Sequence, residues 1–288
     1  MTQNKLGLVV IFYNPTEDNI KTVRAMSNCN DLVIVDNSES PSDYNIEKAH
    51  VITLRENLGI ASALNIGIKY LIDNGYEYAL LLDQDSEPGY ELISSLLEYI
   101  STSSEDVCLV APAYYDRAID KKADFIYCQS KKIVRIPAIG NEAIDASYVI
   151  TSGSMLRISA IKKIGLMCDN LFIDFVDIEW CLRARALGYH ILGLPWLCMS
   201  HEIGDVPVKV FNKKYVNHSP IRHYYYFRNV FLLLRMKHIH SQWKKMELLK
   251  LAPRFAVYSL FTKNRHKHFL SMLSGIVDGV LGRSDKKR

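Results

Sequence analysis

The sequence predicts an α/β protein with a mostly parallel sheet flanked by helices and a helical appendage at the C-terminus. Three observations lead to this prediction. Short apolar runs alternate with amphipathic stretches through the first two-thirds of the 288 residues, which is typical of a parallel sheet covered on both faces. Polar side chains close several of the apolar runs. Beyond about residue 205 the pattern changes, and aromatic and basic residues gather.

The expected elements alternate along the chain. Strands are expected over residues 7–13, 32–37, 50–54, 78–82, 107–112 and 190–201. Helices are expected over 17–26, 59–72, 92–100 and 158–164, and residues 172–189 turn from a loop into a helix closed by Gly188. An edge strand is expected within 131–139. Because ligands of such sheets gather at the carboxyl ends of strands, the residues there are the first candidates for a site.

The bulk composition places limits on the class of protein. The length suits one large domain, or one domain plus a smaller appendage. None of the six cysteines forms a close pair typical of a zinc or redox site, so we expect free thiols in a reducing compartment. The opening residues MTQNKLGLVVIFYN do not have the pattern of a signal peptide, and no run approaches the ~20 apolar residues of a spanning helix. We therefore expect a cytoplasmic protein.

Two carboxylates end one of the expected strands. Asp83 and Asp85 follow the apolar run YALLL with Gln84 between them. Carboxylates at a strand end can hold Mg²⁺ or Mn²⁺, which take their other ligands from phosphate oxygens and water. The alternative is a polar turn, which the nearby Ser86 and Pro88 would favour.

Other polar residues admit both structural and functional interpretations. Asp36 could belong to an ordinary turn or accept hydrogen bonds from a nucleobase or ribose. Asp174, Asp177 and Glu179 surround an expected helix start, where they could cap the helix or supply a general base. His201 could be structural or a nitrogen ligand of the same cation. The segment RENLGIASALNIG (55–67) offers a helix N-terminus for a phosphate, although its spacing matches neither a P-loop nor a dinucleotide fingerprint.

Seven segments in order resemble the inverting glycosyltransferases of family 2, which have the GT-A fold. They are FYN, VDNS, NLGIASALNIG, LLDQD, TSGSML, FIDFVDIEWCLRA and His201, and together they cover roughly residues 5–205. Two segments, RENLGIASALNIGI and HYYYFRN, look most like bacterial rhamnosyltransferases that use dTDP-L-rhamnose to build O-antigen and related polysaccharides.

The resemblance implies roles for particular residues. Asp83, Asp85 and His201 would hold Mg²⁺ or Mn²⁺. Asp177 would be the catalytic base, with Asp174 as a second candidate because Val176 replaces the acid that the family usually has before the base. The donor would be bound by Phe12, Asn14, Asp36, Asn57, Gly59, Asn65, Gln84, Gly153 and Ser154. The acceptor and diphosphate would lie near Trp180, Arg183 and Glu179.

The division of charge suggests two regions, 1–205 and 206–288. Residues 209–288 hold 18 Lys and Arg against three Asp and Glu, whereas the rest of the chain is acidic. The basic region is expected to be helical, broken at Pro253, with an apolar face over 270–281. It could bind nucleic acid or an anionic membrane, form a dimer through residues 224–231, or be merely solvated. We favour the inner face of the cytoplasmic membrane, where a lipid-linked saccharide acceptor would be held, and expect no nucleic-acid binding.

Two other classes of protein are open alternatives. A sugar nucleotidyltransferase also pairs carboxylates near a nucleotide, but it needs a basic, glycine-rich phosphate loop, and FYNPTED is acidic. A non-catalytic sugar-binding module could keep the core of a transferase. The presence of Asp83, Asp85, Asp177 and His201 favours an enzyme over such a module.

Overall fold

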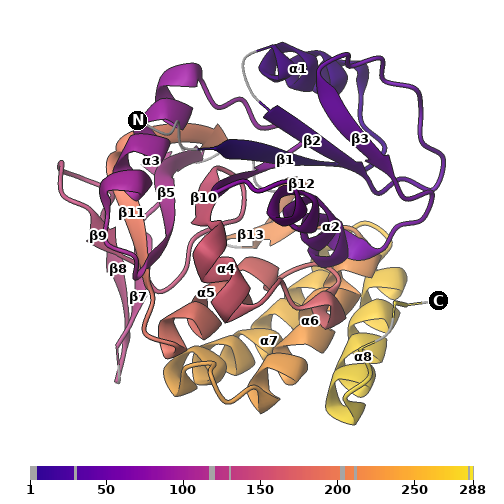
Figure 1. Cartoon of the computed structure of the whole chain (residues 1–288). Helices are drawn as coiled ribbons and strands as arrows, with labels where there is room; N and C mark the ends of the chain where they lie inside the picture. Colours follow the sequence, from indigo (N-terminus) through magenta and orange to yellow (C-terminus); the bar gives the residue numbers. More distant parts are fainter. Residues whose placement is uncertain are drawn as a thin grey trace.

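A computed structural model describes residues 5–28, 31–116, 121–129, 131–201, 205–210, 213–284 and 286–287 (Figure 1). Its strands are β1 (Leu6–Phe12), β2 (Asp31–Asp36), β3 (Ala49–Thr53), β4 (Tyr78–Asp83), β5 (Val107–Asp116), β6 (Lys121–Lys122), β7 (Phe125–Cys128), β8 (Ile133–Ile136), β9 (Ile144–Asp145), β10 (Ser154–Arg157), β11 (His190–His201), β12 (Asp205–Val210) and β13 (Lys213–Asn217). Its helices are α1 (Glu17–Ser27), α2 (Gly59–Asp73), α3 (Tyr90–Thr102), α4 (Ile158–Ile164), α5 (Val176–Ala186), α6 (Pro220–Arg235), α7 (Ser241–Phe261) and α8 (Arg265–Leu281), with a 3₁₀ turn at Asp169–Leu171.

One large sheet organises the first two-thirds of the chain. Its order is β3-β2-β1-β4-β10-β5-β11-β9, and β6 pairs with β5 beside this row. β3, β2, β1 and β4 are parallel, and β11 is parallel to β5. β10 lies antiparallel between β4 and β5, and β9 is antiparallel to β11. The prediction of a mostly parallel sheet flanked by helices is therefore confirmed.

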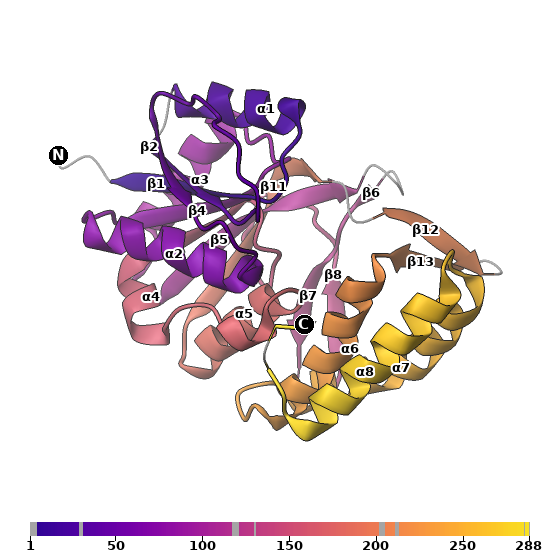
Figure 2. The same cartoon turned by 90° about the vertical axis from the view of Figure 1, so that its right-hand side faces the viewer.

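Alternate residues of β1 supply two separate cores. Leu8 and Val10 pack with apolar residues of α1 and α3, whereas Val9 and Ile11 pack with α2 on the opposite face. This two-sided burial follows from the period of two in a strand, and it explains why the strand is apolar throughout. Figures 1 and 2 show the helices on the two sides of the sheet. The register brings Phe12 opposite Asp36 and Ile11 opposite Asp83, so the ends of β1, β2 and β4 lie level and bring the two carboxylates to the same edge.

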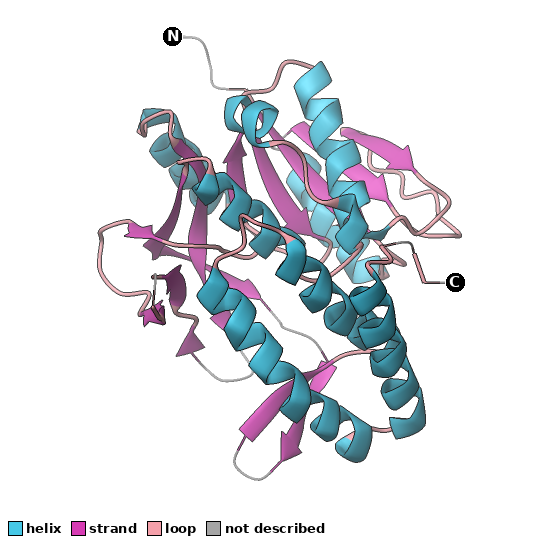
Figure 3. Ribbon diagram, turned by 90° about the horizontal axis from the view of Figure 1, so that it is seen from below, coloured by secondary structure: helices cyan, strands magenta, loops and turns pink. Residues whose placement is uncertain are grey.

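The C-terminal residues form a hairpin, β12–β13, and then three helices that pack against the rest of the chain (Figure 3). α8 lies close to α6 at two glycines. A Cβ added to Gly275 would lie 2.3 Å from the carbonyl oxygen of Tyr224, and one added to Gly279 would lie 2.6 Å from that of Arg228. Phe227 of α6 belongs to the same hydrophobic cluster as the sheet face covered by α2. Residues on both sides of the predicted boundary at 205 thus share one core.

One local prediction is confirmed in a different sheet, and another was wrong. Residues 131–139 supply an edge strand, β8, but it pairs with β7 in a separate two-stranded sheet, and β9 takes the edge of the large sheet beside β11. Pro253 does not break the helix, since α7 runs continuously from Ser241 to Phe261. Pro253 and Leu249 are both exposed, so water can satisfy the carbonyl that loses its helical partner.

Cysteine pairing and membrane spans can be examined over the described residues. Their five cysteines are all free thiols, as expected. Within those same residues, no helix combines the length and the apolar character needed to cross a membrane.

Candidate active site

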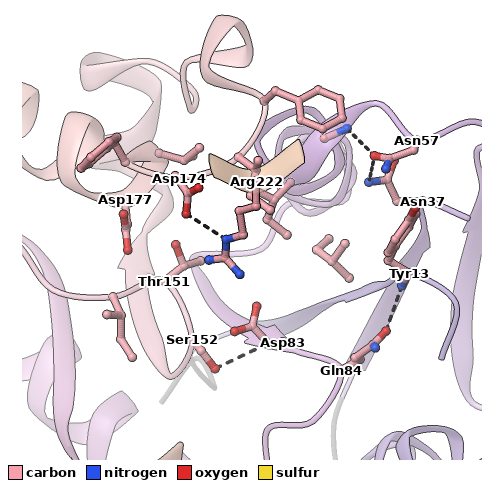
Figure 4. Close-up of a pocket in the computed structure, with 18 of the residues that line it drawn as sticks. Tyr13, Asn37, Asn57, Asp83, Gln84, Thr151, Ser152, Asp174, Asp177 and Arg222 are labelled. Atoms are coloured by element: carbon pink, nitrogen blue, oxygen red, sulfur yellow. Dashed lines mark hydrogen bonds and ion pairs between the residues drawn. The ribbon is translucent and has the colours of Figure 1, made fainter. Parts of the chain in front are cut away.

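A cavity of about 640 Å³ opens at the carboxyl ends of β1, β2 and β4 (Figure 4). Its walls come from these strand ends, the start of α2, the turn before β10, the loop that leads into α5, and α6. The residues that line it include Tyr13, Asn37, Asn57, Gly59, Asp83, Gln84, Asp85, Thr151, Ser152, Phe172, Asp174, Phe175, Asp177, His218 and Arg222. The large sheet and the C-terminal region therefore build this cavity together.

Backbone and hydroxyl contacts fix the turn that carries the paired carboxylates. The N–H of Asp83 donates to Ser86 Oγ at 3.2 Å, and Ser86 Oγ lies 2.5 Å from Ser152 Oγ. Gln84 Oε1 accepts the N–H of Tyr13 at 2.9 Å, which ties the turn to the end of β1. The turn is thus an ordered part of the cavity wall, and both Asp83 and Asp85 line the cavity.

The donor set suits a hard divalent cation that keeps open positions. Two carboxylates, with phosphate oxygens and water completing the shell, are the usual ligands of Mg²⁺ and Mn²⁺. Within the described side chains, no group of three His, Cys, Asp or Glu could hold a metal by itself. His201 ends β11, but its side chain lies outside the described part of the structure, so its role as a ligand stays a prediction.

Asp177 lies in the first turn of α5 and points into the cavity (Figure 4). Its Oδ1 accepts the N–H of Ile178 at 2.8 Å. Burial, together with the negative charges of Asp174 and Asp83, raises the pKa of Asp177 from 3.8 to about 6. A carboxylate whose pKa lies this close to neutrality can accept a proton and still be ionised at physiological pH.

Asp174 differs from Asp177 because it is ion-paired. Its Oδ1 accepts the Nε–H of Arg222 at 3.0 Å, whereas its Oδ2 is buried without a hydrogen-bond partner among the described residues. Burial raises the pKa of Asp174, and the Arg222 guanidinium opposes that rise. The Oδ1 atom of Asp174 is therefore engaged by Arg222.

The loop before α5 adopts a conformation that bulky residues rarely take. Phe172, Asp174 and Phe175 have φ angles of 62°, 64° and 66°, in the left-handed region. Such residues cost about 1–3 kcal/mol each and persist only where their surroundings fix them. The ring of Phe172 stacks on Tyr225 of α6, with ring centroids 4.5 Å apart. The ring of Phe175 contacts Trp243 of α7 edge to face.

Two side chains of α6 fix the same loop through its carbonyls. Asn229 Nδ2 donates to the carbonyl oxygens of Leu171, Ile173 and Asp174 at 2.8, 2.8 and 3.1 Å. The neighbouring Arg228 is fully buried and donates from Nη2 to the carbonyls of Asn170 and Leu171. The segment HYYYFRN, noted in the sequence only as a resemblance, thus holds the loop that leads to Asp177.

The predicted donor residues fall into two groups. Asn57, Gly59 and Gln84 line the cavity. The others do not line it: Phe12, Asn14, Asp36, Asn65, Gly153 and Ser154. Their roles toward a donor stay predictions.

Several of the residues that do not line the cavity hold the surrounding turns and segments in place. Asp36 is fully buried and accepts hydrogen bonds from the Tyr44 hydroxyl at 2.6 Å and the Ser38 N–H at 2.9 Å. Asn65 exchanges two hydrogen bonds with the backbone of Met167, at 2.8 and 2.9 Å, which ties α2 to the segment before the 3₁₀ turn. Gly153 has a φ of 79° and no room for a Cβ beside Met199.

The remaining predicted residues hold α5 in place. Trp180 is buried and donates from Nε1 to the carbonyl of Gly165 at 2.8 Å. Arg183 bonds to both oxygens of Glu179 at 2.9 and 3.0 Å, and to the carbonyls of Ile164 and Leu166 at 2.7 Å each. None of the predicted acceptor or diphosphate residues lines the cavity. Together they fix the helix that presents Asp177.

The sequence predictions did not include several residues of the cavity wall. Thr151 and Ser152 belong to the predicted small-residue turn, where the prediction singled out the two residues that follow them. Arg222 lies in the basic region that was interpreted as a separate surface, and it contacts a residue 48 positions away. The segment HYYYFRN, which begins one residue later, was the available signal.

The chain belongs to glycosyltransferase family 2. Residues 8–165 match the family described as "Glycosyl transferase family 2". The chain is 36% identical over 293 aligned residues to the dTDP-rhamnosyl transferase RfbF of Shigella flexneri, and the match covers 95% of both proteins. The protein is therefore a glycosyltransferase, and the resemblance to family 2 is confirmed.

Other relatives are more distant. The low-salt glycan biosynthesis hexosyltransferase Agl10 of Haloferax volcanii is 25% identical over 196 residues, covering 65% of this chain and 63% of Agl10. The structure of GalNAc-T7 with UDP, GalNAc and Mn²⁺ aligns with a TM-score of 0.56 at 12% identity, covering 85% of this chain and 54% of that one. The structure of S. aureus TarS 1–349 aligns with a TM-score of 0.56 at 16% identity, covering 97% and 82%. These likenesses confirm the GT-A-like fold.

Proposed function

We propose that this glycosyltransferase moves L-rhamnose from dTDP-L-rhamnose, with inversion, to a hydroxyl of a lipid-linked saccharide during assembly of O-antigen or another cell-surface polysaccharide. The observation that carries the proposed reaction is the Asp177 carboxylate, of raised pKa, in the same cavity as Asp83 and Asp85. The similarity to RfbF over nearly the whole chain supports the choice of donor.

The proposed chemistry is a single displacement. The acceptor hydroxyl gives its proton to the Asp177 carboxylate while its oxygen attacks the anomeric carbon from the face opposite the diphosphate. The bond between that carbon and the diphosphate breaks, and its electron pair stays on the leaving oxygen. The sugar passes through an oxocarbenium-like transition state, as in glycoside hydrolysis. Because only one displacement occurs, the configuration at the anomeric carbon inverts.

Asp83 and Asp85 would hold Mg²⁺ or Mn²⁺ in this scheme. The cation would supply positive charge to the departing diphosphate. The structure of the distant relative GalNAc-T7 contains Mn²⁺, which supports divalent metal use in proteins of this fold. The ordered turn around Asp83, with its Ser86 and Ser152 contacts, keeps the carboxylates at the cavity wall.

Asp177 is a better candidate for the base than Asp174. The pairing with Arg222 satisfies the charge of Asp174, which makes that carboxylate a weaker proton acceptor. Asp177 Oδ1 accepts a hydrogen bond from a backbone N–H, and both burial and neighbouring carboxylates raise the pKa of Asp177. The absence of an acid at position 176 therefore does not leave the cavity without a base.

A donor and metal screen tests the proposal. Wild-type protein is incubated with dTDP-L-rhamnose and, separately, with UDP- and GDP-sugars, each with Mg²⁺, Mn²⁺ or EDTA, and nucleotide release is measured with and without a polyprenyl diphosphate-linked saccharide. We expect metal-dependent release of dTDP and, with acceptor, a product of inverted anomeric configuration. Asp177→Asn should bind dTDP but transfer sugar about 10²- to 10⁴-fold more slowly. Glu98→Gln, which removes an exposed carboxylate on α3, should behave as wild type. Transfer by Asp177→Asn at the wild-type rate would remove Asp177 from the role.

We further propose that the protein works at the inner face of the cytoplasmic membrane, held there by α8. One face of α8 packs on α6 through Gly275 and Gly279. The other carries an exposed apolar stripe, made of Leu270, Leu273, Val277 and Leu281. A helix that is apolar on both sides and lies at a surface needs an apolar partner for its outer face.

Charge complementarity favours an anionic bilayer as that partner. Lys263, Arg265 and Lys267 are exposed at the start of α8, and Arg283 is exposed just after its end. Each basic residue near an anionic surface contributes about 1 kcal/mol to binding. This arrangement is typical of interfacial helices, whose apolar face enters the lipid between basic flanks.

Vesicle sedimentation tests this attachment. We expect binding to vesicles rich in phosphatidylglycerol at low salt, weaker binding at 0.5 M salt, and little binding to phosphatidylcholine alone. Leu270→Glu with Leu273→Glu should abolish binding, whereas Ile139→Glu, at an exposed apolar site outside the helices, should not. If light scattering instead shows a homodimer that the double variant separates, and no vesicle binding, the stripe is an interface between two copies of the chain.

A further inference from the structure

Arg222 reaches the cavity from the C-terminal region. It lies in the first turn of α6, and its side chain is 40% exposed. Nε donates to Asp174 Oδ1 at 3.0 Å. Figure 4 shows its guanidinium extending from Asp174 into the space beside Asp83 and Ser152. A residue of the basic region thus faces the carboxylates that belong to the sheet.

Only one edge of this guanidinium is used within the fold. Among the described residues, Nη1 and Nη2 of Arg222 make no hydrogen bond. The arginines that brace the structure are different: Arg183 uses both terminal nitrogens on carbonyls, and Arg185 uses both on Asp145. Two parallel, accessible N–H donors fit a pair of phosphate oxygens.

The charges of the cavity also favour a cationic side chain at this place. Four carboxylates line it, those of Asp83, Asp85, Asp174 and Asp177. Burial lowers the pKa of His218 to about 4, so this lining imidazole is neutral at physiological pH. Among the described lining residues, Arg222 is the one Lys or Arg side chain. An anionic donor would be repelled by the carboxylates unless positive charge faced it.

We propose that Arg222 binds the diphosphate of the nucleotide-sugar donor through Nη1 and Nη2 while its Nε remains on Asp174. Asp174 is then a positioning residue, because it fixes the plane of the guanidinium. This inference rests on the proposed function only in requiring that the donor is a nucleoside diphosphate sugar. Arg222 offsets the charge that grows on the leaving diphosphate, from the side of the cavity that α6 forms.

The same helix fixes both members of the Arg222–Asp174 pair. Asn229 bonds to the carbonyl of Asp174, seven residues along α6 from Arg222. Arg222 and Asp174 are therefore both held by α6. Because the guanidinium is already held in place, it loses little conformational freedom when it binds an anion. A preorganised donor group binds an anion more tightly than a mobile one.

Nucleotide titrations separate diphosphate binding from a structural role. Kd values for dTDP, by calorimetry with Mg²⁺, and for thymidine, by ligand-observed NMR, are measured for the wild type, Arg222→Gln, Arg222→Lys and Lys163→Gln. We expect Arg222→Gln to weaken dTDP binding about 10- to 100-fold, the loss expected for a charged hydrogen-bonded pair. Thymidine affinity should not change. Arg222→Lys should fall between, since an ammonium cannot hold Asp174 and two phosphate oxygens together. Lys163→Gln removes an exposed charge on α4 and should match the wild type.

Two results would overturn the proposal. One is dTDP affinity in Arg222→Gln equal to that of the wild type. The other is an equal loss of dTDP and thymidine affinity in both Arg222 variants, which would indicate a damaged pocket. If circular dichroism shows that Arg222→Gln does not fold, Arg222→Lys tests the proposal instead. The measure is again the loss of dTDP affinity relative to the loss of thymidine affinity. Wild-type protein that binds UDP but not dTDP would contradict the proposed donor, and the titrations with UDP and uridine would still test Arg222.

Discussion

Replacing Asp177 with asparagine is expected to stabilise the fold while removing sugar transfer. The carboxyl has a pKa of about 6 in the folded protein, against 3.8 in its ordinary state. The folded state therefore disfavours the ionised form that the unfolded chain accepts freely. Asparagine keeps an oxygen for the Ile178 N–H and carries no charge. The substitution thus removes the electrostatic cost without removing the hydrogen bond.

The magnitude and its pH range follow from the two pKa values. A difference of about two units corresponds to about 3 kcal/mol at pH values above both, and the open cavity reduces this to about 1–3 kcal/mol. Above pH 6 the wild type bears the full cost. As the pH falls from 6 to 4 the folded carboxyl takes up its proton before the unfolded one does, so the cost disappears. The stability advantage of Asp177→Asn should therefore be largest near pH 8 and absent near pH 4.

Urea unfolding at pH 8 and pH 4, in EDTA, measures the difference between wild type and variant. Asp73→Asn removes an exposed carboxylate at the end of α2 and should change stability by less than about 0.5 kcal/mol at either pH. Transfer by Asp177→Asn should fall by about 10²- to 10⁴-fold, the usual contribution of a general base. A variant less stable than the wild type at pH 8, or a difference that does not vary with pH, would refute the reasoning.

Three further predictions concern the same site and its supports. Wild-type kcat/KM for transfer should fall about tenfold per pH unit below pH 6, because Asp177 must be ionised to accept a proton, and a profile flat to pH 5 would contradict this. Asn229→Ala should lower the free energy of unfolding by about 1–3 kcal/mol in urea titrations, because buried carbonyls of the loop before α5 lose their donor; unchanged stability would show that water replaces it. Gly275→Ala should cost about 1–3 kcal/mol in thermal melts because its Cβ meets the Tyr224 carbonyl, whereas Leu273→Ala, on the exposed side of α8, should cost less than 1 kcal/mol.

Sequence patterns predicted β1 to β5 and β11, and the helices beside them, to within a few residues. The apolar runs at β1, β2 and β4 are long and clearly bounded, because both faces of a central parallel strand are buried. The sequence patterns did not predict β10, although it lies between β4 and β5, because its four residues directly follow a small-residue turn. The prediction that was wrong concerns an exposed position. Pro253 lies at the surface of α7, where solvent can take over a lost hydrogen bond, and local propensity does not report exposure. The small β7–β8 sheet depends on pairing that a single apolar run does not specify.

Some residues of the candidate site are marked by local sequence, whereas the position of others relative to the cavity is not. The carboxylates at the end of β4 and at the start of α5 were predicted because strand ends and helix starts are marked by local sequence. The donor-binding roles of Asp36 and Asn65 stay predictions, and within the fold these side chains form hydrogen bonds with Tyr44, Ser38 and Met167. A polar residue at a strand end looks the same in the sequence whether it faces a cavity or supports the wall behind it.

The sequence by itself determined most strands of the large sheet and the carboxylates at the end of β4 and the start of α5, because each is marked by short-range patterns of polarity. The resemblance of its ordered segments indicated the family. Only the tertiary structure decided that the basic C-terminal region completes the cavity. The contact of Arg222 with Asp174 spans 48 residues, and that of Asn229 with Leu171 spans 58. No local pattern encodes such distances, since they arise from the packing of α6 against the loop before α5. The charge of Arg222, interpreted in the sequence as part of a surface, lies beside the carboxylates for that reason.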